Sequence, residues 1–134
     1  METYTHLLIN GVTKNPPKDE SIITPWLNNL IESINSEVRE VHIKPVVAPI
    51  YSYLDKDGIK GLTSTAIVET GYVAVRVWEE DDVSSIHLDM LLSSPLPVFL
   101  VLESVADIFG MYDGVYMLLD RKDDFKTLEY KSYP

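Results

Sequence analysis

The chain has 134 residues, no cysteine and a formal net charge of −10. Its length and ordinary composition predict one globular domain whose folding buries roughly two thirds of the surface of the unfolded chain. The lack of cysteine excludes disulfides, thiolate catalysis and cysteine-based zinc sites, and the acidic charge argues against binding to nucleic acid or anionic membranes.

The first part of the chain predicts a strand, a loop and a helix. Residues 4–12 read as the strand, and two prolines within 14–20 place a loop after it. Thr24 is the expected N-cap of the helix, with Pro25 at the first helical position. Helical spacing predicts one apolar stripe, formed by Trp26, Leu27, Leu30, Ile31 and Ile34.

Residues 38–47 predict a second strand, in which Pro45 belongs at a bulge or a sheet edge because proline cannot donate a ladder hydrogen bond. Residues 50–54 are open to interpretation as an extension of this strand. The sequence DKDG at 55–58 predicts a turn.

Residues 61–89 predict the central antiparallel hairpin. Apolar and polar residues alternate over 72–78 and again over 85–90, which is the pattern of strands with one buried face. One face of the first strand carries Val73, Val75 and Val77, and the other carries Tyr72, Ala74, Arg76 and Trp78. Four consecutive acids at 79–82 predict a solvated turn, because burying them together would be costly.

The last third of the chain predicts a helix and a strand. Prolines in 93–97 end the hairpin, and 98–109 read as a helix with Phe99, Leu102, Ala106 and Phe109 on one side and a stop at Gly110. Residues 113–114 predict a turn into a final strand at 115–120. Residues 121–134 read as a loose polar tail.

This order of elements predicts an α+β fold, a two-layer α/β sandwich in which both helices cover one face of an antiparallel sheet. The chain shows no linker or internal repeat, so 1–120 form a single domain and 121–134 a C-terminal tail. The uncovered face of the sheet is left to water, a ligand or a second copy of the chain.

Several short motifs resemble the bacterial-type S-adenosylmethionine decarboxylase family. The opening HLLIN at 6–10 is similar to that family's first strand, and EVREV at 37–41, followed by Ala48-Pro49, to the strand after its first helix. GLTS at 61–64 resembles the family's G-V-S-G, and VWEE at 77–80 its T-W-P-E, without a gap between them. SSI at 84–86 resembles the next strand. The resemblance extends from about His6 to Leu91.

The resemblance implies a self-cleaving decarboxylase with a pyruvoyl cofactor, a ketone made from a serine, which forms a Schiff base with the substrate amine and withdraws electrons as carbon dioxide leaves. In this chain Gly71 stands at the position of the family's reactive serine, and Thr70 stands at the position of the glutamate that precedes it. The other reactive positions of the family hold Tyr72, Ala74, Arg76 and Leu91, in place of a histidine, the processing serine and histidine, and the proton-donor cysteine.

Each of these replacements removes the reactive group, so no pyruvoyl is expected to form and no cofactor is predicted. Gly71 has no hydroxyl, and Arg76 stays protonated and cannot act as a base. An alignment shifted by one residue leaves an alternative, in which Glu69-Thr70 stands for the family's Glu-Ser pair and the Thr70 hydroxyl attacks the Glu69 carbonyl.

Ligand-binding candidates gather in the central hairpin. Tyr72, Arg76 and Trp78 share one face, where they could stack a flat ligand or pack against a second subunit. Asp89 and Glu69 are candidate paired carboxylates. We favour two other interpretations, in which they are solvated or one of them is the ion-pair partner of Arg76 across the hairpin. His6, His42 and His87 all fall on predicted strands. We favour polar positions on the open face for them over a metal site, because their spacing is not that of a ligand pair.

The leading hypothesis is therefore a non-catalytic relative of the decarboxylase. It would homodimerise through the sheet or its edge and bind a small molecule or a partner protein, such as an active decarboxylase that it regulates. The alternatives are an enzyme, either self-processing at Thr70 or of changed chemistry in the same pocket, and a structural homo-oligomeric module. The N-terminus does not have the pattern of a signal peptide, and the longest apolar run, 98–102, is too short to cross a bilayer, so a cytoplasmic protein is expected.

Overall fold

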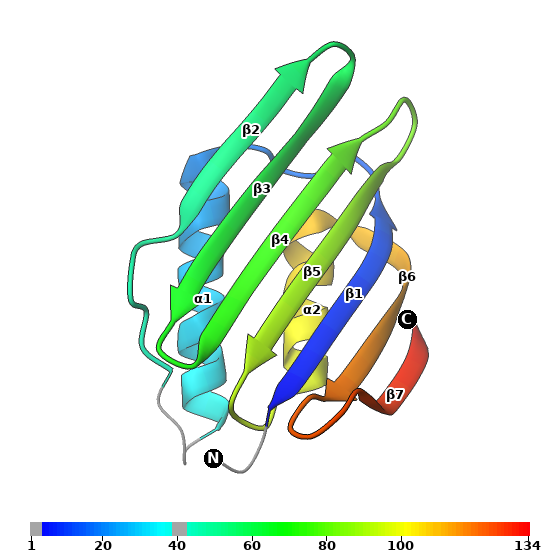
Figure 1. The fold of residues 1–134 in the computed structure, drawn as a ribbon. Helices are drawn as coiled ribbons and strands as arrows, with labels where there is room; N and C mark the ends of the chain where they lie inside the picture. The colour runs from blue at the N-terminus through cyan, green and yellow to red at the C-terminus, as the bar shows by residue number, and fades with distance from the viewer. Residues whose placement is uncertain (1–3, 39–42) are drawn as a thin grey trace.

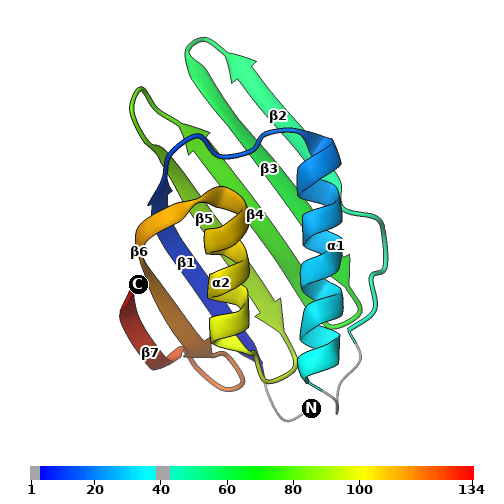
Figure 2. The ribbon, with the colours of Figure 1, turned by 180° about the vertical axis from the view of Figure 1, so that it is seen from behind.

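The computed structural model describes residues 4–38 and 43–134. Within these ranges the chain forms an α+β fold of seven strands and two helices, and all strands pair antiparallel in the order β2-β3-β4-β5-β1-β6-β7. Both helices cover the same face of the sheet (Figures 1 and 2), as the sequence predicts. The elements are β1 (Thr5–Thr13), α1 (Glu20–Glu37), β2 (Ile50–Lys56), β3 (Ile59–Val68), β4 (Gly71–Glu79), β5 (Ser84–Leu92), α2 (Val98–Phe109), β6 (Met111–Asp120) and β7 (Lys126–Tyr133).

The core lies between the sheet and the two helices. Val73, Val75 and Val77 of β4 face the helices and are at most 1% exposed, as the alternation of the sequence predicts. The helices meet through Trp26 of α1 and Phe109 of α2, whose rings pack edge to face with centroids 5.0 Å apart. The opposite face of the sheet has no helix over it.

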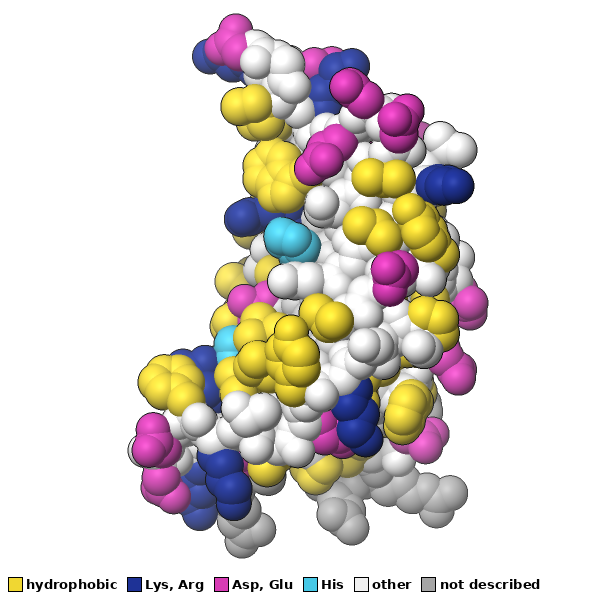
Figure 3. All heavy atoms as spheres, turned by 90° about the vertical axis from the view of Figure 1, so that its right-hand side faces the viewer, with side chains coloured by type: hydrophobic (Ala, Val, Ile, Leu, Met, Phe, Trp, Pro, Cys, Tyr) yellow, Lys and Arg dark blue, Asp and Glu magenta, His cyan; other side chains and the backbone are white. Residues whose placement is uncertain are grey.

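The central hairpin is confirmed for β4 and β5, whereas residues 61–68 of the predicted span belong to the separate strand β3. β4 and β5 pair in register, with Ala74 opposite Asp89 and Arg76 opposite His87. The acidic turn between them is solvated, since Glu80 is exposed, and acidic side chains gather at this end of the molecule (Figure 3).

The first helix starts earlier than predicted. Asp19 is the N-cap, because its carboxylate accepts a hydrogen bond of 2.9 Å from the Ser21 amide and so satisfies a backbone group that the helix leaves free. Pro25 therefore lies inside α1 rather than at its first position. The predicted apolar stripe of α1 is buried in full.

The second helix has the predicted bounds. Gly110 ends it in the left-handed conformation, with φ of 68°, and its amide donates to the Ala106 carbonyl over 2.8 Å. The predicted apolar side is wrong at Phe99, which is 66% exposed. Val101 and Val105 instead turn toward the sheet with Leu102.

The prediction of a strand over 38–47 is wrong for its described residues. Val38 caps α1, residues 39–42 lie outside the described part of the chain, and Pro45 makes a single bridge to Val68. The strand that follows α1 in the chain is instead β2, at Ile50–Lys56. A two-residue turn at Asp57 and Gly58, both with positive φ, joins β2 to β3. β3 is an additional strand within the span predicted as the hairpin.

The C-terminal expectations need two corrections. Asp113 and Gly114 do not form a turn but lie within β6, where Gly114 pairs with Gly11. The segment 121–134 is not a loose tail, because β7 pairs along β6. Its alternation is weak because most of its side chains are exposed, so periodicity did not reveal it.

Neither helix in the described ranges combines the length and the apolar character needed to cross a membrane.

Candidate ligand-binding site on the open sheet face

The uncovered face of the sheet brings four predicted site residues together. Tyr72, Arg76 and Trp78 alternate with the buried valines of β4 and so point away from the helices, and Asp89 of β5 points the same way beside them. This confirms that the three β4 residues share one face.

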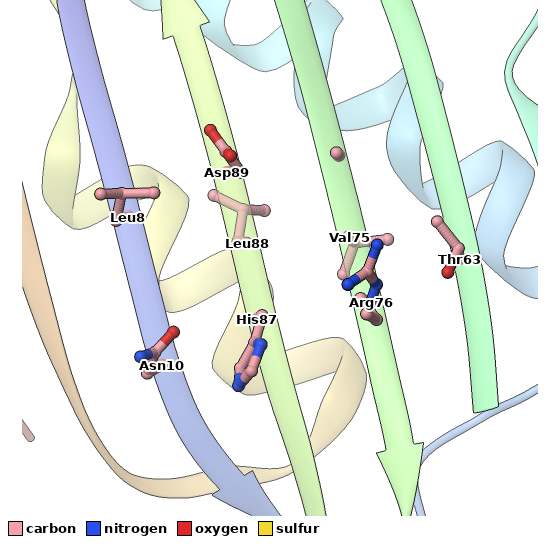
Figure 4. Close-up of a pocket in the computed structure, with 9 residues that line it drawn as sticks. Leu8, Asn10, Thr63, Val75, Arg76, His87, Leu88 and Asp89 are labelled. Carbon is pink, nitrogen blue, oxygen red and sulfur yellow. The ribbon is translucent and has the colours of Figure 1, made fainter. Parts of the chain in front are cut away.

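A hollow of about 240 Å³ lies near the middle of this face, over β1, β3, β4 and β5. Figure 4 shows how its side chains come from these strands, with Asn10 on β1, Thr63 on β3 and Arg76 on β4 around His87 and Asp89 on β5. Its lining also includes Leu8, Ala74, Val75 and Leu88. The lining of the hollow therefore combines the Asp89 carboxylate with the Arg76 guanidinium and the His87 imidazole.

Asp89 is held by a chain of hydrogen bonds that reaches the end of β6. Its Oδ1 lies 2.5 Å from His6 Nε2 and accepts a bond of 3.1 Å from the Tyr72 hydroxyl. On the other side of the His6 ring, Arg121 Nη1 lies 2.7 Å from Nδ1. A guanidinium can only donate, so Nδ1 is the acceptor and Nε2 carries the proton that is shared with Asp89. His6 is thus a neutral link between a carboxylate and a guanidinium.

This arrangement fixes the orientation of Asp89 and uses both nitrogens of His6. The His6 ring is buried, whereas the Asp89 side chain is 43% exposed at the hollow. Burial, together with the negative charge of Asp89, raises the pKa of the Tyr72 phenol, so Tyr72 remains a donor at neutral pH. Asp89 is therefore a preoriented acceptor for a ligand, and His6 has no nitrogen left to act as a base.

Arg76 lies over Trp78 rather than against an acid. Its Cζ is 5.5 Å from the Trp78 ring, a cation–π distance. Across the strands, Trp78 lies over Gly61, where an added Cβ would come within 2.7 Å of the indole. The alternative in which Arg76 forms an ion pair with Glu69 or Asp89 is wrong, because no salt bridge among the described residues joins them. The Asp89 carboxylate is bound by His6 and Tyr72 instead.

Glu69 and Thr70 lie apart from the hollow, in the connection between β3 and β4. Glu69 is exposed, and its amide donates to the Lys44 carbonyl over 3.0 Å. It does not pair with Asp89, which lies on β5 opposite Ala74. The Thr70 hydroxyl is buried and has no hydrogen-bond partner among the described residues.

Gly71 is closed off by the neighbouring strand. A Cβ placed on it would lie 1.8 Å from the Leu91 carbonyl oxygen and 2.8 Å from the Leu91 carbonyl carbon. Backbone atoms cannot be turned aside as a flexible side chain can, so only glycine fits this position.

The two described histidines, His6 and His87, do not share a site. His6 is tied to Asp89 and Arg121, His87 is exposed on β5, and His42 lies outside the described residues. The described part of the chain contains no group of three histidine or carboxylate side chains placed to hold a metal ion.

A second polar cluster lies on the other face, where β2 extends past α1. Tyr53 donates to Glu79, whose other oxygen is 2.9 Å from Lys18 Nζ. The hydrogen bond from Tyr53 to Glu79 is the main reason that the pKa of Tyr53 is raised to about 12. Burial alone would raise the pKa of Glu79, but the bonds from Tyr53 and Lys18 outweigh it and lower that pKa.

The roles of His6 and Arg121 at Asp89 are not evident from the sequence. Alternation places His6 on the open face, but its partners come from β5 and from the residue after β6. Only the pairing of β1 between these two strands brings the three side chains together.

The fold and site define an α+β two-layer protein with a charged hollow on the uncovered face of its sheet. Neither the protein-family models nor the curated proteins compared with this chain include a match to it.

Proposed function

We propose that the protein is a non-catalytic relative of the bacterial-type S-adenosylmethionine decarboxylases that binds a small molecule in the hollow of its open sheet face. The observation that carries this proposal is Asp89. Its carboxylate is oriented by His6 and Tyr72 and opens into the same hollow as the Arg76 guanidinium. A fixed carboxylate and a guanidinium that share one concave site are what a small ligand with both charges would need.

Two features support a lack of self-cleavage. The position that corresponds to the family's reactive serine is Gly71, and the carbonyl of Leu91 leaves no room there for a side chain. The alternative nucleophile, Thr70, has no group within hydrogen-bond distance in the described residues that could take its proton. The pyruvoyl group of the family therefore does not fit this chain.

The size and charge of the hollow indicate the class of ligand. A volume of about 240 Å³ is below the range of pockets for drug-sized molecules, which begins near roughly 300 Å³. It suits an amino acid, or the amino-acid end of a larger molecule such as S-adenosylmethionine. The ammonium would bind Asp89, and the carboxylate would bind Arg76.

Calorimetry with S-adenosylmethionine and with free methionine tests this proposal. We expect binding to the wild-type protein and at least about a tenfold loss in Asp89→Asn, because the variant leaves the ammonium without its charged partner. Asp81→Asn, which makes the same chemical change in the β4–β5 turn, is the matched control and should bind as the wild type does. Equal affinity of the two variants, or no binding of either probe, would contradict the proposal.

The mass of the purified protein tests the non-catalytic part separately. One intact chain of 15.2 kDa is expected, and two fragments with a ketone at a new N-terminus would refute it. Should carbon dioxide be released from S-adenosylmethionine, Thr70→Ala would decide whether Thr70 is responsible.

The biological role that we propose is regulation in S-adenosylmethionine and polyamine metabolism, exerted by a homodimer or through contact with an active decarboxylase. A change in the activity of such an enzyme on titration with this protein, present for the wild type and lost in Asp89→Asn, would be the expected sign of ligand-dependent regulation.

A further inference from the structure

The two edges of the sheet differ in how well they are protected against pairing with another chain. β7, at one edge, contains Lys126 and Lys131, and its pairing with β6 is interrupted by a register shift between Leu118 and Leu119. On this side of the molecule acidic and basic side chains are interspersed with hydrophobic ones (Figure 3). Lysines and bulges are the usual means by which proteins keep an edge strand unpaired.

β2, at the opposite edge, is less protected: it has no register shift, and its one lysine is its last residue. Its pairing with β3 is regular over all seven residues, and its charged residues, Asp55 and Lys56, lie only at its end. Among the described residues β2 pairs with β3 alone, so a row of backbone amides and carbonyls faces outward along the strand.

Half of the exposed large hydrophobic side chains in the described chain lie at or next to this edge. Twelve large hydrophobic residues in the described chain are exposed, and six of them fall within residues 46–67, on β2, on β3 and in the connection that leads to β2. They are Val46, Val47, Ile50, Leu54, Ile59 and Ile67. A cluster of this kind beside an open edge is typical of a protein interface.

Charge does not oppose the approach of a second copy here. Residues 43–68 contain three lysines (44, 56 and 60) and two aspartates (55 and 57), a formal charge of +1, although the whole chain carries −10. The centre of the open face is a poorer surface for self-association. Packing two such faces together would cover the ligand hollow and remove both Arg76 and Asp89 from water, which carries a desolvation cost.

We infer that β2 pairs antiparallel with β2 of a second copy, around a two-fold axis at Ser52. This names the surface of the homodimer in the proposed function, on which it rests, and it does not involve the ligand hollow. In this register Ile50 lies opposite Leu54 on the open face, Tyr51 lies opposite Tyr53 on the helix face, and Ser52 meets its own copy.

The side chains suit this pairing. Ile50 and Leu54 are 61% and 43% exposed, so contact between them removes apolar surface from water. The hydroxyls of Tyr51 and Tyr53 are already bound within the chain, to the Lys18 carbonyl and to Glu79, which holds both rings in place for aromatic contact across the axis. Because the β7 edge is protected against pairing, the assembly stops at two copies. The product is a dimer with one continuous sheet of fourteen strands rather than a filament.

Sedimentation of Leu54→Lys tests the interface, with Leu128→Lys on β7 as the matched control, since the two leucines are exposed to 43% and 49%. We expect the wild-type protein and Leu128→Lys to be dimers that dissociate on dilution, and Leu54→Lys to be a folded monomer at the same concentrations. A monomeric wild-type protein, or a dimeric Leu54→Lys, overturns the inference.

The register is tested by disulfide trapping, because the chain has no cysteine of its own. Ser52→Cys should form an intermolecular disulfide under mild oxidation, and Ser132→Cys, on the other edge strand, should not. Failure of Ser52→Cys to cross-link, or equal cross-linking by both variants, contradicts the pairing around Ser52. Both tests leave Asp89 unchanged, so failure of ligand binding and failure of the dimer can be told apart.

Discussion

The contact at Gly71 predicts a large loss of stability on adding a single methyl group. In Gly71→Ala, the new Cβ would lie 1.8 Å from the Leu91 carbonyl oxygen, and the carbonyl carbon is only 2.8 Å away. The contact can be relieved only if β4 and β5 move apart at the point where they pair. Overpacking of a rigid site costs about 1–3 kcal/mol or more, and we expect the upper end because the obstacle is backbone.

A loss of about 3 kcal/mol corresponds to a large shift in melting temperature. For 134 residues, an entropy of unfolding of about 2.1 cal/mol/K per residue gives about 280 cal/mol/K, so the midpoint should fall by about 11 °C. Gly58→Ala is the control, since nothing lies within 4 Å of the added Cβ and only the positive φ of 80° opposes it. That variant should lose about 1 kcal/mol.

Urea denaturation of Gly71→Ala and Gly58→Ala measures the two losses of stability and so tests whether Gly71 has room for a side chain. If Gly71→Ala is no less stable than Gly58→Ala, the site has room for a side chain, and the steric argument against a reactive serine is wrong. Gly71→Ser should be as unstable as Gly71→Ala and should remain uncleaved. Cleavage before residue 71 in that variant would show that the position still supports the chemistry of the family.

Two further predictions concern contacts outside the hollow. Because the pKa of Glu79 is lowered in the folded protein, its carboxylate contributes stability above the ordinary value of 4.5 that is lost as pH falls through the folded pKa. Tyr53→Phe should therefore be less stable than the wild type at neutral pH, and the difference, followed by chemical denaturation, should shrink in acid; a constant difference would mean that the bond to Glu79 is not its cause. Asn35 donates to the Ile43 carbonyl over 2.7 Å and accepts from its amide over 2.5 Å, so Asn35→Ala should cost about 2 kcal/mol by leaving both backbone groups unpaired. Asn29→Ala, an exposed change on the same helix, should be nearly neutral, and similar melting points for the two variants would contradict this account.

The central hairpin and both helices could be predicted because their signals are local. The alternation of Val73, Val75 and Val77 reflects a strand with one buried face, and the left-handed stop at Gly110 reflects the end of a helix; both patterns lie within a few neighbouring residues. The start of α1 was misplaced because both Asp19 and Thr24 have the chemistry of an N-cap, and the sequence alone gives no reason to choose Asp19.

Long-range pairing decided the remainder of the fold. No side chain of β7 is fully buried, and β7 is a strand because β6 offers it hydrogen bonds, so nothing in its own pattern required an ordered segment. Phe99 illustrates the same limit, since the position of the sheet determines which side of α2 is buried.

By itself, the sequence determined the α+β class, the shared face of Tyr72, Arg76 and Trp78, and the position of Asp89 next to them, because strand geometry alternates side chains without reference to the rest of the chain. Only the tertiary structure decided that β1 lies between β5 and β6, which connects His6 to Asp89 and Arg121 across separations of 83 and 115 residues. It alone also closed the space at Gly71 and left β2 as the less protected edge. Contacts of this kind depend on which strands become neighbours, and that choice is made by the packing of the whole domain.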